Sequence, residues 1–320
     1  MNQGWIYQDR MRATEAGLTI LEFYTRRYRH SSQADWQRRI EAGQVLLDGV
    51  QGFTESLIQA GQLLSYHRPP WQEPEVPLSF EVLYEDADLL VVTKPSGLPV
   101  LPGGGFLEHT LLHQLRCCYP QDTPVPIHRL GRGTSGLMLL ARSPLAKAHL
   151  SQQLRKSTAG GGLVHSHRSI HKTYRALIGA GDIPDRLTIN QPIGKISHEQ
   201  LGYIYGASTD GQFARSDVEV VRRDLESTLV EVTIFTGRPH QIRIHLASAG
   251  FPLLGDPLYG VGGIPKPFSE DFDAKQPVPG DCGYALHAYR LAFLHPRTQQ
   301  PMNFECLPPV NLRACQMLGC

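Results

Sequence analysis

The residues best suited to chemistry form one short loop, Ile127–Gly136, which reads Ile-His-Arg-Leu-Gly-Arg-Gly-Thr-Ser-Gly. Its glycines permit a tight backbone, while His128, Arg129 and Arg132 offer hydrogen bonds and positive charge. The loop stands directly before the apolar run 137–141, which is typical of a buried strand. This setting suits contacts to phosphate or sugar. A tight turn with solvated arginines explains the same residues equally well.

A second polar stretch, Thr236–His245, places Arg238, His240, Gln241 and Arg243 at the start of a predicted helix. Free backbone N–H groups and the helix dipole favour anions at a helix N-terminus. The stretch therefore indicates an anionic partner. The alternative is an ordinary charged and solvated helix surface.

A third group of basic residues lies near the N-terminus, interleaved with aromatic rings. Its members are Arg26, Arg27, Arg29, Arg38 and Arg39, with Tyr24, Tyr28 and Trp36 among them. Arginines beside rings are typical of a phosphate-binding face with stacking aromatics. The same residues also describe a helix pair with a buried apolar face, and both interpretations can hold together.

Two weaker patterns do not predict a metal site. His109 and His113 have the spacing of metal ligands on one helix, but no glutamate follows the first histidine. Cys117 and Cys118 lack a second cysteine pair at zinc-site spacing. A metal-dependent hydrolase is therefore set aside.

The overall composition is that of an ordinary globular protein, with 41% hydrophobic and 19% charged residues. Because the formal net charge is only +1, a nucleic-acid site must be a local patch. Six cysteines without framework spacing indicate reduced thiols and a cytoplasmic location. Asp9 and Glu15 interrupt any apolar signal region, and no apolar run is long enough to span a membrane.

The spacing of apolar residues predicts a small module over residues 1–67. Helical periodicity begins near Ile20, and a Ser-x-x-Asp capping box ending at Asp35 starts a second helix that runs to about Glu41. Strands are expected at 45–47 and 62–66. The proline-rich segment 68–77 is the predicted linker.

A larger domain is expected over 78–310, followed by a tail at 311–320. Predicted strands are 80–84, 89–93, 137–141, 173–178 and 229–236. Helices are expected after Ser143-Pro144 and after Pro239, the second ending at Gly250. Interleaved strands and helices of this kind indicate the α+β class.

Taken in order, several segments resemble the RluA-type family of RNA pseudouridine synthases over about residues 78–309. The segments that carry the resemblance are 82–86, 91–98, 128–136, 172–177, 237–246, 255–260 and 286–296. The resemblance implies a mixed, mainly antiparallel sheet. Residues 40–45 and 47–49 are similar to the S4-type RNA-binding domain that often precedes this catalytic domain.

The resemblance implies that the chain acts on ribosomal or transfer RNA without metal or cofactor. The enzyme would cleave the N-glycosidic bond of a uridine, rotate the uracil and rejoin it through carbon 5. Tyr174 would lie against the uracil and assist proton removal, and Arg243 would pair with the catalytic aspartate. Arg129 would help extrude the target base. No membrane or protein partner is implied.

The chain departs from the family at the catalytic position, because Gly131 stands where the family has aspartate, and Gly133 at a second acidic position. One hypothesis is that another carboxylate, Asp122 or Asp256, enters the site. A second is altered chemistry on uridine. The third is a catalytically inactive RNA-binding protein in which Arg243 has lost its partner and contacts phosphate.

Overall fold

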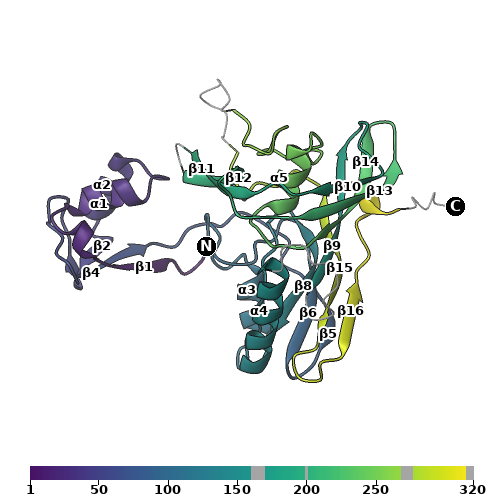
Figure 1. The fold of residues 1–320 in the computed structure, drawn as a ribbon. Helices are drawn as coiled ribbons and strands as arrows, with labels where there is room; N and C mark the ends of the chain where they lie inside the picture. The colour runs from purple at the N-terminus through teal and green to yellow at the C-terminus, as the bar shows by residue number, and fades with distance from the viewer. Residues whose placement is uncertain (160–169, 199–200, 268–276, 315–320) are drawn as a thin grey trace. The chain divides into compact units, whose positions relative to one another are not determined.

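The computed structural model describes residues 1–159, 170–198, 201–267 and 277–314. The chain divides into two compact units (Figure 1). Unit 1 contains residues 1–73 with 197–204, and unit 2 contains 74–196 with 205–320. The division after Glu73 falls inside the proline-rich segment 68–77.

Unit 1 packs two helices, α1 (Ile20–Arg27) and α2 (Gln33–Glu41), with a four-stranded antiparallel sheet. The strand order is β1 (Trp5–Arg10), β4 (Leu63–Arg68), β2 (Val45–Leu47) and β3 (Val50–Gln51). Both helices, β2 and β4 were predicted. The first strand was missed because almost all of its side chains are exposed, so the sequence shows no alternation.

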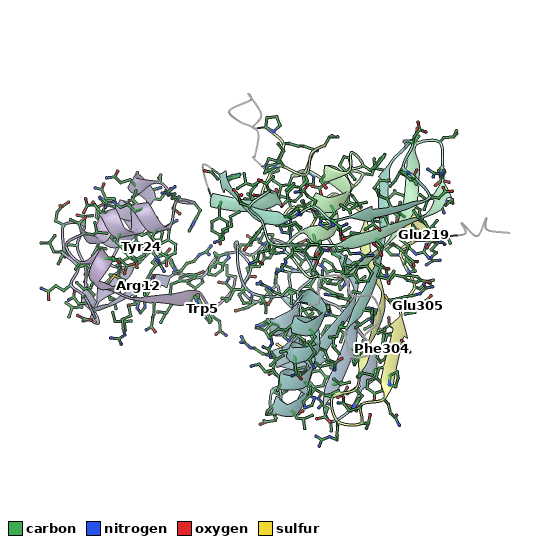
Figure 2. All side chains as sticks on the ribbon, viewed as in Figure 1. Trp5, Arg12, Tyr24, Glu219, Phe304 and Glu305 are labelled. Carbon is green, nitrogen blue, oxygen red and sulfur yellow. The ribbon has the colours of Figure 1, made fainter. Side chains whose placement is uncertain are left out.

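Capping boxes and aromatic stacking fix the helices of unit 1. Thr19 and Ser32 each accept a backbone N–H bond three residues on, at 3.1 Å, from Glu22 and Asp35. The carboxylates of Glu22 and Asp35 in turn accept hydrogen bonds from the backbone N–H groups of Thr19 and Ser32. The buried ring of Tyr24, which is labelled in Figure 2, stacks on Trp36 with centroids 4.4 Å apart. The predicted aromatic residues therefore do form a core.

Unit 2 is built on a ten-stranded sheet, and its pairing is antiparallel except where β15 lies parallel to β8. The main order is β10-β13-β14-β9-β15-β8-β6-β5, with β16 beside β15 and β7 beside β8. The bounds are β5 (Glu81–Glu85), β6 (Leu89–Lys94), β7 (Val125–Pro126), β8 (Ser135–Ala141), β9 (His171–Gly179), β10 (Arg186–Ile189), β13 (Ser216–Arg223), β14 (Ser227–Ile234), β15 (Leu286–Leu294) and β16 (Pro301–Glu305). Strands β11 (Ile193–His198) and β12 (Gly202–Ala207) form a separate pair. The mixed, mainly antiparallel α+β fold is confirmed.

Three helices accompany this sheet: α3 (Leu111–Cys118), α4 (Pro144–Ala159) and α5 (Gln241–Ser248). The predicted α4 packs against β8 (Figure 1). Helix α3, which was not predicted, starts after His109, so His109 and His113 do not share a helix. In α5, every residue from Gln241 to Ala247 is buried. The alternative interpretation of this helix as a charged, solvated surface is therefore wrong.

The end of the described chain belongs to the core of unit 2. A short 3-10 helix, Val310–Leu312, buries Leu312 against Leu177 and Leu229. The predicted tail 311–320 therefore begins too early, and its residues 315–320 lie outside those described. Among the described helices, none has the length and apolar character needed to cross a membrane.

Candidate active site

The loop 127–134 is delivered to the site by the parallel contact between β8 and β15. Gly136 pairs with Ala288, and a Cβ at Gly136 would lie 2.3 Å from the Ala288 carbonyl oxygen. With a φ of 105°, this position also requires glycine for conformational reasons. The parallel pairing brings the loop before β8 to the same end of the sheet as the residues before β15.

A buried lysine fixes the shape of this loop. The Nζ of Lys94 donates to the carbonyl oxygens of Arg132 (3.2 Å), Pro95 (2.8 Å) and Leu98 (2.7 Å). Burial lowers the pKa of Lys94 to about 7. Ser96 adds a 2.7 Å bond from its hydroxyl to the Gly133 carbonyl oxygen. The segment 91–98, the second half of the predicted hairpin, therefore holds the loop through bonds to Arg132 and Gly133.

His128 ties the loop to β8 and does not present a charge to a ligand. Its Nε2 accepts the backbone N–H of Leu139 at 3.1 Å. Burial and the nearby charge of Lys172 lower the pKa of His128 to about 3, so the ring is neutral. His128 therefore positions the loop, and its contact to RNA stays a prediction.

The two loop arginines differ in their availability. Arg132 donates from Nε to the Gly280 carbonyl oxygen at 2.7 Å and lies 3.9 Å from Asp281. The side chain of Arg129 is exposed, and no hydrogen bond or ion pair reaches it from the part of the chain that the structure describes. Of the two, Arg129 is the one open to a ligand.

Arg243 is buried and already paired with a carboxylate. Its Nε and Nη2 each donate to Asp256 at 2.7 Å, and Asp256 also accepts the backbone N–H groups of Leu258 and Tyr259. Burial acts to raise the pKa of Asp256, but the bonds from Arg243 hold it below its usual range. The hypothesis that Arg243 is unpaired and free for phosphate is therefore wrong.

The other acid considered as a replacement, Asp122, lies elsewhere. Its carboxylate is 3.7 Å from the Arg142 guanidinium, and its side chain is 57% exposed. Arg142 in turn bonds Glu85 at 2.5 Å. The carboxylate beside Arg243 is Asp256, and the proposal for Asp122 is not supported.

Tyr174 lies on β9, where it pairs with Val232 on one side and Ala288 on the other. It is 7% exposed, and burial raises its pKa well above the usual range, so the phenol is neutral. Within the described residues its hydroxyl has no hydrogen-bond partner. A neutral phenol with a free hydroxyl is available to a substrate.

Lys172 joins the segments around Tyr174. It is two residues earlier on the same face of β9 and buried, which lowers its pKa to about 8. Its charge acts on His128, and its Nζ lies 3.4 Å from the Cβ that Gly237 would carry. Three segments separated in sequence, at 128, 172 and 237, therefore meet at this point.

Tyr284 fills the space beside Gly131, the position at which the resemblance implies an aspartate. A Cβ at Gly131 would lie 2.9 Å from the Tyr284 hydroxyl oxygen, and one at Gly133 would lie 3.0 Å from its Cζ. The guanidinium carbon of Arg243 lies 4.3 Å from the ring centroid. Sequence reasoning missed Tyr284, although it stands two residues before the 286–296 motif.

The residues predicted at the start of α5 bond within the protein. Gln241 is buried, and its Oε1 accepts from the Thr236 hydroxyl at 2.7 Å and from Arg238 N at 3.1 Å. His240 Nδ1 lies 2.7 Å from the Tyr259 hydroxyl, and burial lowers its pKa to about 4. Arg238 donates to Gln212 at 2.6 Å. All three residues therefore have a structural role, and their contacts to RNA stay predictions.

In unit 1, most of the predicted basic face is neutralised. Arg26 pairs with Glu22 at 3.4 Å, Arg27 with Asp9 at 3.2 Å, and Arg38 with Asp35. Arg39 lies over Trp36 at 4.5 Å and Arg68 over Trp71 at 3.5 Å. An open cavity of about 440 Å³ is lined by residues that include Arg38, Arg39, Tyr66, Arg68 and Trp71. This cavity is the basic, aromatic feature of unit 1.

The described cysteines and histidines form no metal centre. Cys117 and Cys118 are exposed thiols, Cys282 is half-buried and Cys306 is buried, and all four are free. No group of three His, Cys, Asp or Glu side chains suited to a metal occurs in the ranges that the structure describes.

Comparison with known proteins places this arrangement in one family. Residues 88–248 match the model of the RNA pseudouridylate synthase family. A Synechocystis protein named as an uncharacterized RNA pseudouridine synthase is 50% identical over 91% of this chain and 94% of its own length. A protein of Neisseria meningitidis named ribosomal large subunit pseudouridine synthase D is 32% identical over 89% of this chain and 73% of its own.

A solved human structure shares the fold. The human RNA pseudouridylate synthase domain containing 4 protein superposes with a TM-score of 0.52 and 24% identity, covering 72% of this chain and 90% of that one. The shared fold agrees with the family match. The chain therefore belongs to the RNA pseudouridylate synthase family, whose members isomerise uridines in RNA to pseudouridine.

Proposed function

We propose that this chain isomerises uridines with Tyr174, Arg129 and the loop 128–136, supported by the buried Arg243–Asp256 pair. The observation that carries the proposal is the free, neutral hydroxyl of Tyr174 at the point where three family segments meet. Arg129 follows His128 in the sequence, is exposed and suits base extrusion. The two bonds to Asp256 hold Arg243 in place within the site.

Ribosomal RNA is the substrate class we favour, with transfer RNA as the alternative outcome. The supporting observation is the Neisseria relative, whose name refers to the large ribosomal subunit. A cytoplasmic location is also our proposal, supported by the free thiols of all four described cysteines.

Unit 1 is proposed to hold the RNA as an S4-like module. Its open cavity combines Arg39 and Arg68 with the rings of Tyr66 and Trp71. No carboxylate pairs with either arginine among the residues described. Guanidinium groups bind phosphate while flat rings stack on bases, so this combination suits a single-stranded or looped segment.

One specific observation favours a second candidate function, an RNA-binding protein without activity. Position 131 has no carboxylate, and Tyr284 takes up the space beside it. Loss of a catalytic nucleophile ordinarily costs several orders of magnitude in rate. A folded protein that binds RNA and leaves every uridine unchanged would match this alternative.

The experiment that separates the two candidates is pseudouridine mapping of RNA from cells with and without the gene. The purified protein is then given the unmodified RNA, with Tyr174→Phe as a matched loss-of-function variant. The proposal predicts a defined pseudouridine that disappears in the deletion and returns with the unaltered protein. No change at any site, together with intact RNA binding, would favour the RNA-binding protein without activity.

A further inference from the structure

We infer that the hydroxyl of Tyr284 takes over the role of the carboxylate that this chain lacks at position 131, an inference that rests on the proposed isomerase function. The phenol oxygen lies 2.9 Å from where a Cβ at Gly131 would stand. It therefore occupies the space into which an aspartate at that position would extend. The chain has exchanged one oxygen-bearing group for another supplied by a different segment.

The two glycines and the tyrosine form a matched set. A Cβ at Gly133 would meet three atoms of the phenol, Cζ at 3.0 Å and Cε1 and Oη at 3.2 Å. Neither glycine has a positive φ, so backbone conformation alone does not require glycine at these positions. What requires it is the Tyr284 ring, and any larger residue at 131 or 133 would displace the phenol.

The surroundings of the phenol are polar on the side that faces the loop. Arg243 lies over the ring at 4.3 Å, and both Arg243 and the Thr134 hydroxyl act to lower the pKa of Tyr284. Gly131 itself is exposed, so the hydroxyl lies directly beneath a surface loop. A ring needed only for packing would be served by phenylalanine, whereas this hydroxyl reaches the catalytic position of the family.

Burial raises the pKa of Tyr284 although Arg243 acts to lower it, so the resting group is a neutral phenol and a proton donor. In the first step, the C1′–N1 bond breaks and its electron pair goes to the uracil. The phenol gives its proton to N1 in the same step. The products are a neutral uracil, a cationic sugar and a phenolate, and the phenolate stabilises the sugar cation while Arg243 stabilises the phenolate.

The second step restores the phenol. After the uracil turns, the π electrons at carbon 5 form the new bond to C1′. The hydrogen on carbon 5 leaves as a proton and returns to the phenolate oxygen. One proton has moved from carbon 5 to N1, which is the net change in the isomerisation, and no oxidant or cofactor is needed. Tyr174 lies against the uracil and assists this proton removal, the role that the resemblance implies for it.

The test compares Tyr284→Phe with Tyr289→Phe, which removes a phenol hydroxyl from β15 at an exposed contact with Glu305. Single-turnover rates of pseudouridine formation and RNA dissociation constants are measured for both variants, and their melting curves confirm folding. We expect Tyr284→Phe to lose about 100-fold or more in rate with unchanged RNA affinity, and Tyr289→Phe to match the unaltered protein. A folded Tyr284→Phe that keeps the full rate would overturn the inference and leave the proposed function standing.

A second variant keeps the test decisive. Gly131→Asp combined with Tyr284→Phe puts a carboxylate into the space that the hydroxyl has left, because Oη is the only Tyr284 atom within 4 Å of the position-131 Cβ. Activity above that of Tyr284→Phe supports the exchange of the two groups. A folded double variant no more active than Tyr284→Phe contradicts it. If the unaltered protein forms no pseudouridine, the proposed function fails, and this inference fails with it.

Discussion

Arg243 and Asp256 form a buried bidentate ion pair in unit 2 with both N–O distances at 2.7 Å, while position 131, where the resemblance implies a carboxylate, is glycine. The pair fixes the Arg243 guanidinium over the Tyr284 ring. Because Asp256 already balances its charge, Arg243 does not need an aspartate at position 131. The site can therefore stay folded with glycine at that position.

Breaking this pair should destabilise unit 2 strongly. Asp256→Asn leaves the Arg243 charge buried without a counter-ion, which typically costs about 3–5 kcal/mol. Urea unfolding measures the loss. Arg186→Ala is the control, because its pair with Glu219 is exposed and such pairs contribute about 1 kcal/mol or less. Equal effects of the two variants would contradict the account.

Acid stability should depend on His128. Its folded pKa of about 3 is below the ordinary value of 6.5, so between these values the unfolded chain binds the extra proton. Stability is therefore lost as the pH falls from 6.5 towards 3. Near pH 5, His128→Gln should reduce the slope of the unfolding free energy against pH by the amount that corresponds to about one bound proton. An unchanged slope would show that the ring is not held neutral.

Gly136 should tolerate no side chain. Gly136→Ala places a Cβ 2.3 Å from the Ala288 carbonyl oxygen and separates β8 from β15. Gly250→Ala is the matched control, since its φ of 93° is similar but no atom lies within 4 Å. The control should cost about 1–2 kcal/mol for the left-handed backbone alone, and Gly136→Ala should cost more. Equal melting temperatures would contradict the steric argument.

The cavity of unit 1 should contribute affinity and not rate. Arg39→Ala and Arg68→Ala should each weaken RNA binding and reduce the salt dependence of the dissociation constant by about one phosphate contact. The rate at saturating RNA should be unchanged. Arg26→Ala is the control, because Arg26 is exposed and paired with Glu22. Affinity that is insensitive to Arg39 and Arg68 would remove unit 1 from the proposed RNA path.

Part of the sheet could be predicted from the sequence, because some of its strands alternate apolar and polar residues or are apolar throughout. Strands β6, β8, β9 and β14 follow this rule, and the capping box at Ser32 gave the start of α2. Other strands were not predicted, among them β1, β10, β13, β15 and β16. Strand β1 is largely exposed, and β13 carries charged residues along its length. Tertiary contacts, not local pattern, decide such segments.

The site itself was only partly predictable. Polar residues in a motif are natural candidates for ligand contacts. His128, Gln241 and Arg238 nevertheless form hydrogen bonds within the protein. The pairing of Arg243 with Asp256 depends on how the chain folds back after α5. Tyr284 reaches Gly131 from more than a hundred residues away, and no spacing in the sequence indicates that contact.

Pseudouridine formation by the purified, unaltered protein on RNA from cells lacking the gene would show whether a chain with glycine at position 131 is an isomerase. We expect one or a few defined uridines to be converted, and we expect Tyr174→Phe to abolish the conversion. RNA that is bound but entirely unmodified, with activity appearing only in Gly131→Asp/Tyr284→Phe, would contradict this expectation.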